Sequence, residues 1–238
     1  MFQVEVANRA GKKVARLAFS NRFGGKSSAP FNELNLATHV GDSAIAVAVN
    51  RSTIADDFNI PVDRITWPGL THSADVGLVE SRLSNFPNVD ILITKLHKQA
   101  LATLAADCVQ LVAVDAESLT VLTAHIGWRG AVAGALESAL DALKQTGSKL
   151  KDVEVWLGPA ICGRCYQVPA ERVLAVQAVL PDALVDGGLD LRIGIQKRLQ
   201  ELQIKVNLVG GCNSCDADYF SYRRDGQTGR QGALVMLT

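Results

Sequence analysis

The feature that most constrains the fold is a series of short apolar runs in the middle of the chain, each ended by polar or turn-forming residues. Segments this short are typical of buried strands, because helices need longer periodic stretches. We therefore expect strands of a central sheet. The runs are Val76 to Val79, Asp90 to Thr94, Gln99 to Ala105, Val109 to Val114 and Leu119 to Ala124.

Segments with apolar residues at helical spacing occur both after and before these runs. After the segment GWRG, apolar residues recur at helical spacing from Val132 to Leu143, and Gly147 is a natural stop. An earlier helix is expected over AIAVAVNRSTIADDF, capped by Asp42 or Ser43, with Ile45, Val47, Val49 and Ile54 as its apolar residues. Further helices are predicted at Ala170–Val179 and Leu189–Leu202, and strands at Val14–Phe19, Val153–Leu157, Lys205–Val209 and Ala233–Leu237. This mixed order indicates an α/β or α+β fold.

Length and charge narrow the function classes. A chain of 238 residues is about one and a half times a typical domain of ~150 residues, and no linker divides it, so we expect one domain over residues 1–238. The formal net charge is zero, which disfavours nucleic acid as a partner. No apolar stretch approaches the ~20 residues of a membrane span. The first residues do not resemble a signal peptide, so we expect a cytoplasmic protein, and the five cysteines are then core residues, ligands or nucleophiles.

Three residues form a candidate metal site. His72 precedes a predicted strand, His125 ends another, and Cys108 lies between two strand-like runs. Neighbouring strands can bring Cys108 and His125 to one edge of a sheet. One Cys and two His suit a zinc ion with an open fourth position. The alternative is a buried Cys and two hydrogen-bonded His without a metal.

Eight strings occur in this order along the chain: FSNRFGG, LNLATHVGD, NRSTIADDF, THSADV, AADCVQLVAVD, TAHIGWRGAVAGAL, LGPAICGRCYQV and FSYRRDGQTGR. Together they resemble the YfiH family, also called laccase-domain or polyphenol oxidoreductase-like proteins, and the resemblance covers Phe19 to Leu237. The resemblance implies a single layered α/β/β/α domain with mixed sheets, and zinc held by His72, Cys108 and His125. Where the family usually carries Gln, this chain has Leu70.

The same resemblance implies purine nucleoside chemistry. The expected reactions are phosphorolysis of adenosine, inosine, guanosine and methylthioadenosine, and deamination of adenosine. Some members of the family look like peptidoglycan editing factors instead, which act on cell-wall precursors. The expected partners are therefore a small nucleoside and phosphate.

The residues near the candidate ligands offer groups for this chemistry. Asp107 and Asp75 are candidate proton carriers, and the Cys108 thiolate belongs to both the metal and the catalytic set. Arg129, at a helix start four residues after His125, is the best candidate for binding phosphate. Arg22 and Arg224 are further substrate-binding candidates, and Asn35 is a candidate for a ribose or base contact, although each of the three also suits a structural role in its loop.

Two CxxC pairs need a separate interpretation. Cys162 with Cys165 and Cys212 with Cys215 each follow a strand-like run, so the pairs can meet and bind a structural zinc ion through four thiolates. Buried free cysteines are the alternative. Aromatic residues in the same motifs are candidates for stacking on a purine or for packing: Phe31, Trp128, Tyr166 and Tyr222.

Three other classes compete with the zinc enzyme. The first class is a multicopper oxidase. A blue-copper site usually has a weak axial Met, but the chain has only Met1 and Met236, and four His are too few for a trinuclear cluster. Copper remains an alternative occupant of the zinc ligands. A metal-free hydrolase would use Cys108 as nucleophile and His125 as base. A non-enzymatic, metal-stabilised partner protein is the third class.

Overall fold

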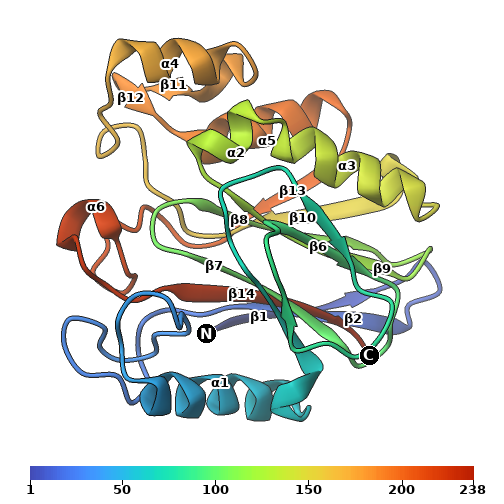
Figure 1. Cartoon of the computed structure of the whole chain (residues 1–238). Coiled ribbons are helices and arrows are strands. Elements are labelled where there is room, and N and C mark those ends of the chain that lie inside the picture. The colour runs from blue at the N-terminus through green and yellow to red at the C-terminus, as the bar shows by residue number, and fades with distance from the viewer.

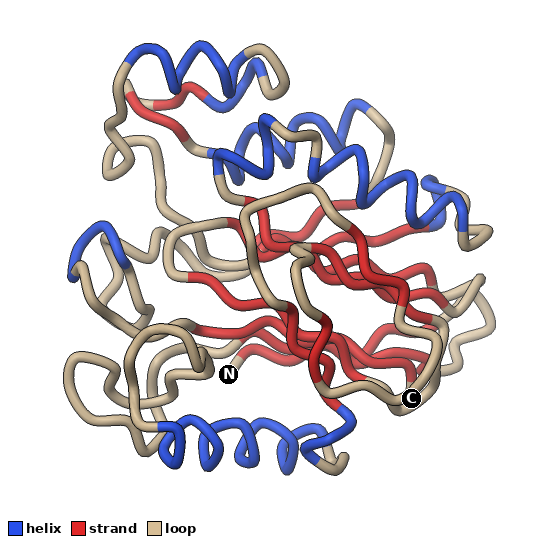
Figure 2. Tube along the Cα trace, viewed as in Figure 1, coloured by secondary structure: helices blue, strands red, loops and turns tan.

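The computed structural model describes Met1–Thr238, and it contains two stacked six-stranded sheets with helices on both outer faces. Helix α1 (Ala44–Phe58) lies below the lower sheet, and α2 (Trp128–Val132), α3 (Ala135–Gln145) and α5 (Leu191–Glu201) lie above the upper one (Figures 1 and 2). This is the α/β/β/α sandwich that the family resemblance implied.

The lower sheet has the strand order β1-β2-β14-β7-β3-β5, in which β3 runs parallel to β7 and β5 and the other neighbours are antiparallel. Its strands are β1 (Phe2–Ala7), β2 (Lys13–Phe19), β3 (Ile65–Pro68), β5 (Asn85–Phe86), β7 (Ala100–Ala105) and β14 (Gln231–Leu237).

The upper sheet has the order β13-β10-β8-β9-β6-β4, with parallel pairs at its two edges. Its strands are β4 (Val76–Leu78), β6 (Ile91–Thr94), β8 (Val109–Asp115), β9 (Thr120–Ile126), β10 (Val153–Leu157) and β13 (Lys205–Leu208).

The remaining elements are α4 (Ala170–Gln177), α6 (Tyr222–Asp225), the hairpin β11 (Leu184–Val185) and β12 (Gly188–Leu189), and short 3-10 turns at Val62–Arg64, Leu150–Asp152 and Pro181–Ala183. No helix is both long and apolar enough to cross a membrane.

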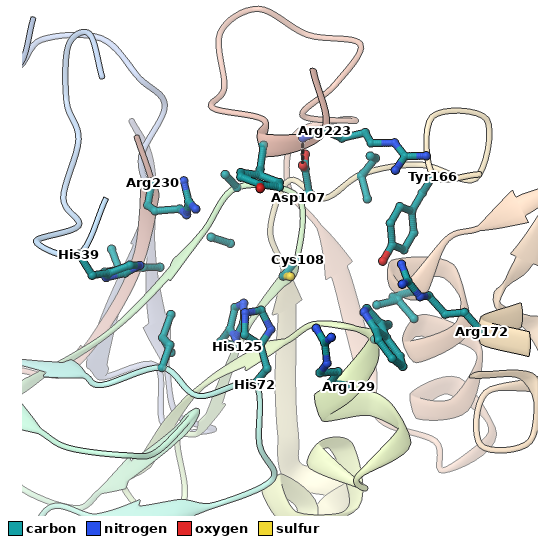
Figure 3. Close-up of a pocket in the computed structure, with 18 residues that line it drawn as sticks. His39, His72, Asp107, Cys108, His125, Arg129, Tyr166, Arg172, Arg223 and Arg230 are labelled. Atoms are coloured by element: carbon teal, nitrogen blue, oxygen red, sulfur yellow. Dashed lines mark hydrogen bonds between the residues drawn. The ribbon is translucent and has the colours of Figure 1, made fainter. Parts of the chain in front are cut away.

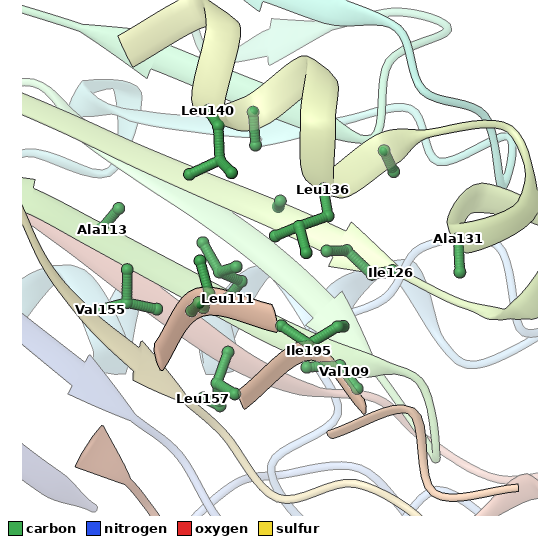
Figure 4. Close-up of a cluster of buried hydrophobic side chains, with 14 of the residues drawn as sticks. Val109, Leu111, Ala113, Ile126, Ala131, Leu136, Leu140, Val155, Leu157 and Ile195 are labelled. Carbon is green, nitrogen blue, oxygen red and sulfur yellow. The ribbon is translucent and has the colours of Figure 1, made fainter. Parts of the chain in front are cut away.

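The central strands are apolar on both faces because both faces are covered. Along β8, Leu111 and Ala113 pack toward the helices above, as Figure 4 shows, whereas Val112 and Val114 pack between the two sheets. A strand buried on both faces has a continuous apolar run instead of strict alternation. Burial on both faces therefore explains why these runs were visible in the sequence.

Several expectations need correction. The five runs do not share one sheet, because β7 pairs with β14 in the lower sheet. The helix expected from Val132 to Leu143 is broken at Gly134, whose φ of 88° lies in the left-handed region, so Val132 ends α2 and is exposed. In α1, Val47 and Ile54 are buried, but Ile45 and Val49 are exposed.

Other elements were refined or missed by the sequence analysis. Ser43 caps α1 by accepting a hydrogen bond from the backbone N–H of Ala46. Strand β1 and the short strand β3 were not predicted. β1 is an edge strand with only Val6 buried, and its apolar residues alternate with polar ones, unlike the continuous apolar runs of the central strands. β3 has only four residues, ends at a proline, and owes its pairing to distant partners in β7 and β5.

Candidate metal centre and its pocket

The candidate site lies where the chain passes between the two sheets. Cys108 ends the short connection from β7 in the lower sheet to β8 in the upper sheet, and His72 lies in the connection from β3 to β4, which makes the same crossing. His125 is near the end of β9, where it pairs with Gln110 of β8. The sheet pairing thus gathers three residues that are far apart in sequence.

The three side chains meet closely enough to share one ion. The ligand atoms of His72, Cys108 and His125 all lie within 4.8 Å of one another, and the two imidazole rings have centroids 4.8 Å apart in an edge-to-face arrangement (Figure 3). A Cβ atom at Gly127 would lie 2.9 Å from both the Cys108 Sγ and the His72 Nδ1. Glycine at 127 therefore leaves the space that this cluster occupies.

Asp90 organises two of the three residues. Its carboxylate accepts a hydrogen bond from His125 Nδ1 at 2.8 Å, which leaves the Nε2 atom of His125 free to act as a ligand. The same carboxylate accepts the backbone N–H groups of Thr71, His72 and Ser73 at 2.8 to 3.1 Å. These bonds hold His72 at a φ of 59°, a conformation that residues other than glycine seldom adopt.

The surroundings of Cys108 and Asp90 favour the ionised forms of both side chains. Burial alone raises the pKa of the Cys108 thiol, but the imidazoles of His125 and His72 outweigh burial and lower it. Burial likewise raises the pKa of Asp90, and the hydrogen bonds from His125 and Ser73 outweigh that effect and lower it well below its usual range. A thiolate is the form of cysteine that binds metals.

The donor set fits a zinc ion. Two imidazole nitrogens and one thiolate are ordinary zinc ligands, and three protein ligands leave a fourth tetrahedral position for water or substrate. The bond from His125 to Asp90 reproduces the carboxylate–histidine pair that orients zinc ligands.

The cluster opens into a pocket of about 690 Å³, which is within the usual size range of small-molecule sites. Four arginines line it: Arg129, Arg172, Arg223 and Arg230. Asp107 is the only Asp or Glu among the 18 lining residues. The pocket therefore has a surplus of positive charge and suits an anionic ligand.

Arg129 and Arg172 are the arginines best placed to bind an anion. Their guanidinium carbons lie 4.7 and 4.5 Å from the centre of the Trp128 ring, so one indole orients both. Neither arginine is among those that form an ion pair with a carboxylate. Their charges are therefore available to a ligand.

Asp107 connects the candidate metal ligands to helix α6. Its two carboxylate oxygens accept hydrogen bonds from Ser221 Oγ at 2.7 Å and from the backbone N–H of Arg223 at 2.6 Å. Asp107 also has a positive φ of 93°. The turn that presents Cys108 is thereby joined to helix α6.

Comparison with known proteins assigns the chain to a family. The sequence profile described as multi-copper polyphenol oxidoreductase laccase matches residues 16–238. The chain belongs to this family. Structurally it is similar to the YfiH protein of Bacillus licheniformis, with a TM-score of 0.88, 27% identity and coverage of 94% of this chain and 93% of that one.

Two proteins with similar sequences are called purine nucleoside phosphorylases. One, from Streptomyces coelicolor, is 37% identical over 94% of this chain and 96% of its own length. Another, from Mycobacterium bovis, is 36% identical over 93% of this chain and 92% of its own length. The pocket offers no methionine as the axial ligand of a blue-copper site, because neither Met1 nor Met236 lines it and Met236 is buried in β14.

Not every residue singled out in the sequence reaches the pocket of this laccase-type protein. The side chain of Asn35 is buried and binds Ala37, Asp42 and the backbone N–H of Arg230. Arg22 donates to the Asn32 carbonyl, and Arg224 donates to carbonyls of the 213–219 loop. Asp75 and Phe31 are also absent from the lining, whereas Trp128, Tyr166 and Tyr222 belong to it.

Sequence reasoning missed five residues that the fold brings to the site. His39, Arg172, Arg223 and Arg230 line the pocket, and Asp90 lies behind the ligands. Three of them stood in the family strings: His39 in LNLATHVGD, and Arg223 and Arg230 in FSYRRDGQTGR. That string was a usable signal, but Arg224 was chosen from it because adjacent arginines cannot be distinguished without knowing which way the short helix α6 faces.

Proposed function

We propose that this protein is a zinc-dependent purine nucleoside phosphorylase that acts on adenosine, inosine, guanosine and methylthioadenosine. The observation that carries the proposal is the cluster of His72, Cys108 and His125 in a pocket lined by four arginines and a single carboxylate. Related proteins that bear the name purine nucleoside phosphorylase align with nearly the whole chain, which supports the same chemistry here.

In the proposed site, His72, Cys108 and His125 hold the metal. Zinc supplies a Lewis acid that polarises an oxygen or nitrogen of the substrate and lowers the pKa of a bound water. Copper is the alternative occupant, since raw affinity favours Cu²⁺ over Zn²⁺ for such ligands. Asp90 fixes the tautomer of His125 in either case.

Phosphorolysis first requires that phosphate be held beside the ribose C1′, and the pocket arginines supply the groups that bind it. Arg129 and Arg172 bind the phosphate oxygens through their planar guanidinium groups, and Trp128 keeps both in place. A phosphate oxygen then forms a bond to C1′ while the bond from C1′ to the purine nitrogen breaks. The products are the free purine and the sugar 1-phosphate, which is ribose 1-phosphate for adenosine, inosine and guanosine and keeps the methylthio group for methylthioadenosine.

The departing purine must gain a proton. Asp107 in its protonated form is the pocket acid proposed to donate that proton to the purine nitrogen. Its hydrogen bonds from Ser221 and Arg223 hold it beside the substrate. The rings of Tyr166 and Tyr222 offer faces for the purine. Asn35 acts indirectly, since its Oδ1 accepts the backbone N–H of the pocket residue Arg230.

Adenosine deamination is a second candidate activity. The observation that favours it is that Asp107 directly precedes the metal candidate Cys108 and lines the same pocket, as a proton-shuttling carboxylate must in a zinc deaminase. Editing of peptidoglycan precursors is the alternative function, and a metal-free Cys108/His125 hydrolase is a further one. We also propose a cytoplasmic location.

The test is product analysis by mass spectrometry of adenosine incubated with zinc-quantified protein, with and without phosphate. We expect adenine and ribose 1-phosphate only when phosphate is present, and inosine if the protein also deaminates. Cys108→Ala and His72→Ala should abolish both. His97→Ala is the matched control, because His97 lies outside the pocket and its imidazole is hydrogen-bonded to the carbonyl of Thr238.

Persistence of adenosine, inosine, guanosine and methylthioadenosine with one zinc bound in the pocket would contradict the proposal. Muropeptides are the substrates to test next in that event.

A further inference from the structure

A second cluster of metal-binding side chains lies outside the pocket. The sulfur atoms of Cys162, Cys165, Cys212 and Cys215 all lie within 4.8 Å of one another. Two pairs that are 50 positions apart in sequence thus converge on one point. No part of the proposed reaction uses these four thiols.

The two CxxC segments adopt the same turn. In the first, the backbone N–H groups of Cys165 and Tyr166 both donate to the carbonyl of Cys162 at 3.1 and 3.0 Å. In the second, the N–H groups of Cys215 and Asp216 both donate to the carbonyl of Cys212 at 3.2 and 3.0 Å. Each turn places its two sulfurs on one side, and the Cys162 N–H donates to the Cys212 Sγ at 3.2 Å.

The spacing of the sulfurs matches a tetrahedral metal site better than a disulfide. Sγ of Cys165 and Sγ of Cys215 lie 3.4 Å apart, whereas a disulfide bond is about 2.05 Å long. Four sulfurs placed about 2.3 Å from a zinc ion at the corners of a tetrahedron are about 3.8 Å from one another. The CxxC spacing of both pairs is also the usual one for structural zinc sites.

We propose that Cys162, Cys165, Cys212 and Cys215 bind a structural zinc ion, separate from the ion proposed for the pocket. All four ligands come from the protein, so no position remains for substrate. Binding replaces the thiol protons, which are released to solvent, and involves no oxidation or reduction.

The proposed zinc ion would hold together the two CxxC loops, which are linked to one wall of the pocket. The first loop contributes Ile161 and Tyr166 to the pocket lining. The second loop is held by Arg224, whose guanidinium donates to the carbonyls of Asn213, Asp216 and Tyr219, and Arg224 belongs to the same short helix as the pocket residue Arg223. The thiolate site thus connects both loops without contacting the substrate.

The test is metal counting by mass spectrometry on protein purified without chelators. We expect two zinc ions per chain in the wild type and one in the double variant Cys165→Ser/Cys215→Ser. Cys108→Ala should also retain one zinc, at the four thiols. This readout does not depend on activity, so failure of the phosphorylase proposal and failure of this one are distinguishable: loss of zinc only in Cys108→Ala would overturn the present proposal alone.

Cobalt substitution of the wild type covers the case in which the double variant fails to fold. Cobalt at four thiolates gives intense sulfur-to-metal charge-transfer absorption, and we expect Cys108→Ala to retain most of it. Alkylation of the unfolded protein, without reductant and with a chelator, should modify all five cysteines. Two thiols missing from that count would reveal a disulfide, and rapid alkylation of Cys162, Cys165, Cys212 and Cys215 in native, metal-quantified protein would reveal free cysteines. Either result would overturn the proposal.

Discussion

The Asp90 carboxylate accepts a hydrogen bond from Nδ1 of His125 at 2.8 Å, deep in the protein where both side chains are almost fully buried. The same carboxylate accepts three consecutive backbone N–H groups from the loop that carries His72. One acidic side chain therefore sets the orientation of two candidate ligands. Cys108 is positioned separately, by the crossing from β7 to β8.

Replacing Asp90 by Asn should weaken zinc binding in the pocket by about 10- to 100-fold, the usual effect of losing such a carboxylate partner. Asparagine has only one acceptor oxygen for a set of donors that now use both oxygens. Competition with a chromophoric chelator measures the affinity. Asp63→Asn, at an exposed 3-10 turn, is the control, and equal affinities of the two variants would contradict the role assigned to Asp90.

Gly127→Ala should also weaken zinc binding, for a steric reason. The added Cβ would lie 2.9 Å from both the Cys108 sulfur and the His72 Nδ1, so the ligands must move apart. Overpacking of this kind costs about 1–3 kcal/mol, or about 5- to 150-fold in affinity. Gly211→Ala is the matched control, because a Cβ there meets nothing within 4 Å. Both variants are made in Cys165→Ser/Cys215→Ser protein, because Gly211 adjoins Cys212 of the second proposed zinc site. Unchanged affinity in Gly127→Ala would show that the site tolerates the extra methyl group.

Arg129→Ala should lower kcat/KM for phosphorolysis by about 100-fold or more while zinc content stays constant, because it removes a phosphate-binding group and no metal ligand. Arg129→Lys should recover part of the loss, since it restores the charge without the planar fork. Exposed Arg82→Ala serves as the control. A parallel loss of zinc and activity would indicate that Arg129 has a structural role.

Chelation and alkylation separate the zinc enzyme from a metal-free cysteine enzyme. We expect activity to disappear with a strong chelator, to return with added zinc, and to be lost on alkylation of Cys108. A Cys108/His125 hydrolase would survive chelation. Repeating the assay with Cys165→Ser/Cys215→Ser assigns the effect to the pocket, because that variant lacks the second proposed zinc site.

Acid should reveal the contribution of Asp115 to stability. Burial raises the pKa of this carboxyl, but hydrogen bonds from Ser118, Ser148 and Glu117 outweigh burial and lower it. A depressed folded-state pKa stabilises the protein above the unfolded pKa of about 3.9, and the stabilisation disappears as pH falls through the folded pKa. Asp115→Asn should therefore cost about 1 kcal/mol at pH 7 and progressively less toward pH 3. Urea unfolding at both pH values measures the difference, and a constant cost would contradict this account.

The element types were largely predictable, and their boundaries and partners were less so. The apolar runs at β6, β7, β8 and β9 were visible because those strands are buried on both faces. Strand β1 was missed because its apolar residues alternate with polar ones and form no continuous run, and the break at Gly134 was missed because the apolar spacing continues across it. Glycine gives no sequence signal of whether it will continue a helix or adopt a positive φ.

The sequence by itself determined most of the core strands and the candidate metal ligands, because continuous apolar runs and the order of the motifs are properties of the linear chain. Only the tertiary structure decided that Asp90 supports His125, that Arg129 and Arg172 face the pocket while Arg22 and Arg224 do not, and that the two CxxC turns meet. These relationships depend on how two sheets stack and where the chain crosses between them. Such long-range packing brings together side chains whose local sequence carries no record of their neighbours.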